Sequence, residues 1–156
     1  MAFVSETVID QHIDRLETTP GAYEATLAEM EKEQPVLLAY FFSENFDLFT
    51  HDEREYLQYL ALVIWSAAKE TCGFKPPVNE EQISEAEDEN WEKLEAVRSH
   101  IFRERVGIFF ENHPQEDLLA FVEDALLDDD EDPLVTKEGR EALFVTLKSV
   151  VDLLTN

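Results

Sequence analysis

Residues 51–71, HDEREYLQYLALVIWSAAKET, constrain the fold more than any other part of the chain. From Tyr56 to Trp65 nearly every residue is apolar or aromatic, so apolar side chains surround the whole circumference of a helix. A helix that is apolar on all sides is buried on all sides. Thr50 and Glu53 have the spacing of a capping box, which predicts that the helix begins at residue 51. We therefore expect a central helix surrounded by other helices.

Helical periodicity also dominates the rest of the chain, and no segment alternates like a β-strand. Gly and paired Pro in GFKPPV (73–78) and the Asn-His-Pro at 112–114 mark the breaks. A chain of 156 residues can bury a core of its own. The prediction is an all-α, single-domain bundle of about six to eight helices over residues 1–156. The remaining helices are expected at 5–17, 20–32, from Pro35 through VLLAYFF, 79–111, 115–127 and 137–154. The helix over 79–111 is expected to carry one apolar stripe, and the last helix one apolar face. The stripe is Trp91, Leu94, Val97, Ile101 and Ile108, and the face is Leu143, Leu147, Val150 and Leu154.

Two parts of the chain are alike. LFTHDEREYL (48–57) matches LVTKEGREAL (134–143), and upstream of them QPVLLAY (34–40) matches QEDLLAF (115–121). The order of the matches is the same, and their spacing differs only across the acidic loop near residues 128–133. Length changes between related units fall in loops. This pattern predicts a duplicated helical hairpin with a pseudo-two-fold relation, as an internal repeat of 1–78 and 79–156. Chance similarity between amphipathic helices is the alternative.

Each copy carries an arginine, Arg54 or Arg140, with no acidic residue three or four positions away on its own helix. Helical arginines in an acidic chain usually have such a partner. We expect each arginine to clamp a carboxylate on the preceding loop, with Asp47 and Asp132 as the candidates. A pair of arginines that binds an anion is the alternative, which the surrounding acidity disfavours.

The charge balance is the most unusual feature of the composition, with 36 acidic and 12 basic residues and a formal net charge of -24. Such a surface disfavours direct binding to nucleic acid or to an anionic membrane, and it favours a basic protein partner. A high-salt habitat would produce the same acidity. The single cysteine, Cys72, excludes an internal disulfide, and the N-terminal residues do not resemble a signal peptide. We therefore expect a cytoplasmic location.

The sequence predicts no catalytic residue, no cofactor and no metal site. None of His12, His51, His100 and His113 has a Glu three residues before it, as the di-iron bundle signature requires. Acidic residues in the loop Asp128–Asp132 have the spacing of the first ligands of an EF-hand. However, Pro133 stands where the turn needs Gly, and Gly139 where the bidentate Glu belongs. Binding of a divalent cation by this loop stays an open question.

These observations predict a non-enzymatic, strongly acidic cytoplasmic protein with an interaction, adaptor or regulatory role. Its partner is expected to be a protein. A basic partner and a homodimer through an aromatic patch are both compatible with the sequence. No partner-binding residue can be named. Two alternatives stay open. One is a nucleic-acid mimic, with its carboxylates gathered on one face. The other is an enzyme or metal-binding protein with a pocket between the two helical halves.

Overall fold

The computed structural model describes residues 2–43, 49–127 and 135–156. All regular structure in these ranges is helical, as predicted, and it comprises eight α-helices and a short 3-10 helix, η2. None of the helices in this part of the chain is both long and apolar enough to span a bilayer. In chain order the elements are α1 (Glu6–Thr18), α2 (Ala22–Glu33), α3 (Pro35–Tyr40), α4 (His51–Cys72), α5 (Glu80–Glu95), α6 (Phe102–Val106), η2 (Gly107–Phe110), α7 (Glu116–Leu126) and α8 (Lys137–Thr155).

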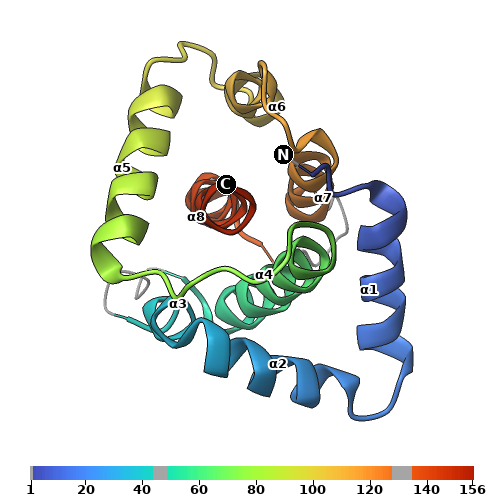
Figure 1. Cartoon of the computed structure of the whole chain (residues 1–156). Coiled ribbons are helices and arrows are strands. Elements are labelled where there is room, and N and C mark those ends of the chain that lie inside the picture. Colours follow the sequence, from blue (N-terminus) through green and yellow to red (C-terminus); the bar gives the residue numbers. More distant parts are fainter. Residues whose placement is uncertain (1, 44–48, 128–134) are drawn as a thin grey trace.

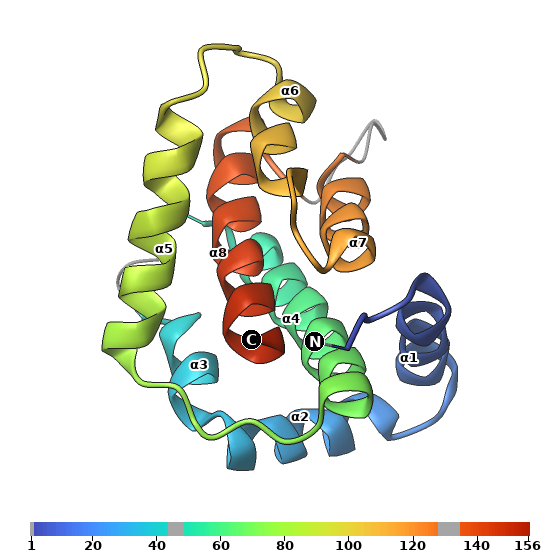
Figure 2. The same cartoon turned by 45° about the horizontal axis from the view of Figure 1, so that its top comes forward.

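The helices are arranged around a central pair. Figure 1 shows α4 and α8 in the middle of the molecule, with the other helices around them. On the outside, α1 and α5 lie on opposite sides, and so do α2 and α6. Figure 2 shows from a second direction that α4 and α8 run beside each other, and the two helices are in contact. The core therefore lies along these two helices.

The predicted central helix is confirmed. It runs from residue 51 to residue 72 and begins with the capping box between Thr50 and Glu53. Its apolar side chains are buried because α1, α2 and α8 contact it on different sides. The partner helix α8 contributes a buried row of its own, also as predicted. The buried members of the two helices include Leu57, Leu60, Leu62, Val63 and Ile64 in α4, and Leu143, Leu147, Val150 and Leu154 in α8.

The prediction of one long helix over residues 79–111 is wrong. α5 ends at residue 95, and the chain forms a turn before α6 and η2. Ile101, which was placed on the buried stripe, is 61% exposed. The turn is held by Arg105, whose Nη1 donates to the carbonyls of Val97 and Ser99 at 3.0 and 3.1 Å. These carbonyls would otherwise need hydrogen-bond donors from a continuing helix. Because the Arg105 side chain supplies the donors, the chain can turn here.

The N-termini of the two central helices meet at one carboxylate, that of Glu53. Its Oε1 accepts the Thr50 N–H at 2.9 Å, while its Oε2 accepts both the N–H and the hydroxyl of Thr136 at 3.1 Å. The side chain is almost fully buried. A Cβ atom on Gly139 would lie 2.2 Å from Glu53 Oε2. A carboxylate suits the partial positive charge of two helix N-termini, and Gly139 leaves room for it.

Two buried glutamines hold the extended segments that precede α5 and α1. Gln34 Oε1 accepts the N–H of residue 78 at 2.9 Å, and its Nε2 donates to the carbonyl of residue 76 at 3.1 Å. Gln115 makes the same pair of contacts with residues 4 and 2, at 2.9 and 2.8 Å. Both glutamines have similar backbone angles, with φ of -135° and -122°. Gln34, before α3, thus holds the segment that leads into α5, and Gln115, before α7, holds the segment that leads into α1.

We predict that Gln34→Met and Gln115→Met each lower the free energy of unfolding by about 1–3 kcal/mol, because each leaves a buried backbone N–H without a partner and also removes a part-buried hydrogen bond to a carbonyl. The two losses should be of similar size. Urea denaturation of each variant measures this. Gln11→Met, at an exposed position of α1, is the matched control and should change stability by less than about 0.5 kcal/mol. A loss at only one of the two glutamines would contradict their equivalence.

Candidate functional site

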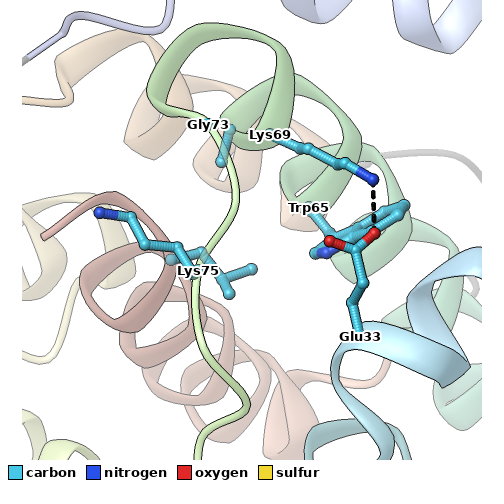
Figure 3. A pocket seen from close by; sticks show the side chains of 7 residues that line it. Glu33, Trp65, Lys69, Gly73 and Lys75 are labelled. Carbon is cyan, nitrogen blue, oxygen red and sulfur yellow. Dashed lines mark hydrogen bonds and ion pairs between the residues drawn. The ribbon is translucent and has the colours of Figure 1, made fainter.

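The space between α2, α4 and the end of α8 is too small for a substrate. Figure 3 shows its lining, in which the Lys69 ammonium is paired with the Glu33 carboxylate. The same ammonium lies 5.1 Å from the centre of the Trp65 ring. Leu154 from α8 completes the lining, and the enclosed volume is about 10 Å³. That volume holds about one water molecule.

A polar network around Asp152 joins α8 to α5 and to the turn before α7. Its carboxylate contacts His113 Nε2 at 3.0 Å, Lys148 Nζ at 2.7 Å and Asn90 Nδ2 at 3.4 Å. Lys148 is buried, with 4% of its surface exposed. Because the Gln115 N–H donates to His113 Nδ1 at 3.0 Å, the ring proton lies on Nε2 and points to Asp152. Each charged group has a partner, so the network stabilises the helix junction.

Glu87 is a half-buried acid at the junction of α3, α5 and α8. Its carboxylate accepts the Tyr40 hydroxyl at 2.8 Å and the Thr146 hydroxyl at 3.1 Å. Burial raises the pKa of Glu87 above its ordinary value, and the two hydrogen bonds oppose this shift without cancelling it. The ionised carboxylate therefore costs stability at neutral pH.

The surface feature with the clearest binding chemistry is a groove between α1 and α7, the α1–α7 groove, with a volume of about 360 Å³. Its apolar lining is Ile9, Ala120, Phe121 and Ala125, and its carboxylates are Glu6, Asp10, Asp117 and Asp124. The two helices contact each other and lie side by side in both Figure 1 and Figure 2. The Glu6 N–H donates to Asp117 Oδ2 at 2.9 Å, which fixes the start of α1 against α7.

Two other hollows border α2. One, of about 310 Å³, is lined mainly by apolar side chains of α2 and of the α3 region, including Leu38 and the half-exposed Phe42. The other, of about 320 Å³, lies between α1, α2 and α4. Here Arg15 donates to the Thr26 hydroxyl at 2.9 Å and contacts the His12 ring at 3.3 Å. Arg15, His12 and Thr26 thus bond to one another within the second hollow.

Exposed carboxylates occur on all the long outer helices and are densest on α5. That helix has a row of exposed acids spaced three or four residues apart, which places them along one side. α1, on the opposite side of the molecule, is also acidic along its exposed positions (Figure 1). The acidity is therefore not confined to one face. The row on α5 consists of Glu81, Glu85, Asp88, Glu92 and Glu95.

The residues tested from the sequence are not gathered into one site. His51 and Glu55 form an exposed pair at 3.0 Å. In the described ranges, no group of three or more His, Cys, Asp and Glu side chains is arranged to hold a metal ion. The loop Asp128–Asp132 lies outside these ranges.

Asp47 and Asp132, the expected partners of the two arginine clamps, lie outside the described residues. Both Arg54 and Arg140 are half-buried, so neither guanidinium is simply free in solvent. The Arg140 guanidinium lies 5.4 Å from the centre of the Phe102 ring, which is a cation–π contact. The clamp itself stays a prediction.

The α1–α7 groove was not anticipated from the sequence. Its lining comes from two segments more than 100 positions apart, and no local motif connects them. The available signal was the pair of small residues, Ala120 and Ala125, on an otherwise bulky amphipathic helix. In comparisons with known proteins, no family model, no curated protein and no solved structure matches this chain.

We predict that Glu87→Gln makes the protein more stable at neutral pH and reduces the dependence of its stability on pH. For an acid whose pKa is raised by folding, the folded state holds its proton more tightly than the unfolded state. The wild type therefore loses stability as the pH rises from about 4.5 through the raised pKa of Glu87. Urea denaturation between pH 4 and 8 measures the difference, which should vanish at the acidic end.

Glu85→Gln is the matched control, because it removes one carboxylate from an exposed position of the same helix. It should leave the difference between pH 4 and pH 8 close to that of the wild type. Equal effects of the two substitutions would mean that net charge, and not the burial of Glu87, sets the pH dependence.

Proposed function

We propose that this protein is a non-enzymatic interaction protein of the cytoplasm, with an adaptor or regulatory role and a basic protein as its partner. The observation that carries the proposal is the row of exposed carboxylates on α5. Like charges three or four residues apart on a helix destabilise it by about 0.2–0.5 kcal/mol per pair. A helix with a purely structural role would gain by alternating these acids with lysines. When a basic partner binds, its positive charges would attract these acids and offset the repulsion between them.

The alternatives receive less support. A nucleic-acid mimic would gather its carboxylates on one face, whereas here α1 and α5 are both acidic and lie on opposite sides (Figure 1). For an enzyme with a site between the halves, the hollow beside Trp65 and Leu154 is too small, at about 10 Å³. Among the described residues, the larger α1–α7 groove is lined by carboxylates and apolar side chains, without a histidine, cysteine, serine or lysine. A homodimer through exposed aromatic side chains such as Phe42 and Phe74 stays a prediction.

The test is binding of a fluorescent lysine-rich peptide, measured at 50 and 500 mM salt. We expect binding that weakens steeply with salt. The variant Glu81→Gln/Glu85→Gln/Glu92→Gln on α5 should bind at least about threefold more weakly than Glu24→Gln/Glu29→Gln/Glu31→Gln on α2, since each exposed pair contributes about 0.2–1 kcal/mol. Both variants remove the same number of exposed charges. Equal weakening would mean that only the net charge attracts the peptide, and would contradict a binding face on α5.

We also propose that the chain is a duplicated unit, in which α1 to α4 correspond to α5 to α8 in order. The support is the matched pair of glutamines, the matched hydroxyl caps of Thr50 and Thr136, and the side-chain caps of Ser5 and Asn79 at the two first helices. Superposing the halves in a crystal structure should bring these pairs together. A best superposition that matches other residues would contradict the duplication.

A further inference from the structure

We propose that the α1–α7 groove is the docking site for one segment of the basic partner, an amphipathic segment that places a bulky apolar side chain on the groove floor and lysines or arginines at its edges. This inference rests on the proposed function and adds to it the place and the chemistry of recognition. It concerns a different surface from the row of acids on α5.

The floor of the groove suits an apolar side chain. Ile9 is nearly fully buried beneath it, and Phe121 is only half-buried, so part of its ring is available to a ligand. Ala120 and Ala125 are partly exposed, and their small side chains leave the hollow open. The volume of about 360 Å³ lies at the lower end of the range of about 300–1,000 Å³ typical of ligand sites. Covering this apolar surface would be favourable.

The edges of the groove suit positive charges. Carboxylates line both helices, with Asp10 on α1 and Asp124 on α7 exposed. The cation that approaches them from α6 is Arg103, which lies 3.9 Å from Asp124 and 3.6 Å from Glu123. Arg103 is thus shared between two carboxylates at long distances and its side chain is 65% exposed. The rim keeps an excess of negative charge, which complements lysine or arginine.

Other occupants fit less well. A second copy of this chain would bring a formal charge of -24 against an acidic rim. A metal ion would need a group of ligands, and the described residues hold no such group of three. A uniformly basic chain would leave Phe121 and the two alanines uncovered. An amphipathic helix with basic flanks satisfies the floor and the rim together, as in other helix-in-groove complexes.

The test uses three fluorescent peptides of equal length with the whole protein: a lysine–leucine amphipathic helix, the same peptide with alanine for leucine, and the same peptide with glutamate for lysine. Fluorescence anisotropy at 100 mM salt gives each affinity. We expect the lysine–leucine peptide to bind at least about tenfold more tightly than the lysine–alanine peptide, because only leucine covers the floor. The glutamate–leucine peptide should not bind.

Protein variants then locate the site. Asp10→Asn/Asp124→Asn should weaken the lysine–leucine peptide by about three- to tenfold, and Ala120→Lys, which fills the groove and adds a like charge, by more. The matched control is Glu24→Gln/Glu29→Gln, which removes two exposed carboxylates from α2 and should have a smaller effect. Circular dichroism melting curves should show that each variant stays folded.

The outcomes separate this inference from the proposed function. If the lysine–leucine peptide binds but both groove variants bind it like the wild type, the groove is not the docking site, while a basic partner on α5 is unaffected. If neither basic peptide binds even at 50 mM salt, the proposed function fails and this inference fails with it. If leucine confers no advantage over alanine, the apolar floor plays no part and the inference is wrong.

Discussion

The carboxylate of Glu53 is the contact on which the rest of the bundle depends. It accepts hydrogen bonds from the first residues of both central helices, so α4 and α8 start from one buried point and then run side by side. A helix end leaves backbone N–H groups without partners, and two such ends in a core would be costly. One side chain satisfies groups at both ends, and the missing side chain of Gly139 makes the approach possible. The outer helices then pack on a pair whose relative position is already set.

Single polar side chains also hold the outer layer together, and the ion pairs of the basic residues leave the surface acidic. The first helix of each half is held by a glutamine from the other half, so the layer is closed by hydrogen bonds between halves. Several of the scarce basic residues are engaged between or within the helices. Lys69 pairs with Glu33, Arg105 with Glu141 and Lys148 with Asp152. With these cations occupied, the exposed carboxylates of α1 and α5 face solvent without an ion pair to a described basic side chain, and on α7 Glu123 and Asp124 share the long contacts of Arg103. A basic ligand has most to gain at such a surface.

The sequence predicts those features that depend on one helix alone. The buried helix 51–72, its capping box and the buried face of α8 follow from periodicity and local caps, and each is found as predicted. The break after α5 could not be read in this way, because the apolar stripe continues through Val97 and Ile101 and the turn is decided by Arg105 from the next helix. Glu53 was read as the cap of one helix. The two matched segments differ at this position, with Glu53 in one and Gly139 in the other. This difference was the sequence signal that Glu53 also contacts the start of α8. The α1–α7 groove depends on how two distant helices pack, which periodicity does not specify.

The account is tested most directly by a double-mutant cycle between Glu53→Ala and Gly139→Ala, with the free energy of unfolding measured in urea. In the wild-type background, Gly139→Ala should destabilise the protein by about 1–3 kcal/mol, because the new Cβ displaces Glu53 Oε2 from Thr136. In the Glu53→Ala background the two contacts with Glu53 are gone, and Thr136 Oγ1, at 3.1 Å, is the nearest contact left to the new Cβ. The same substitution should then be close to neutral, or stabilise by up to about 1 kcal/mol through helix propensity. An equal effect of Gly139→Ala in the two backgrounds would mean that the shared carboxylate does not join the central helices.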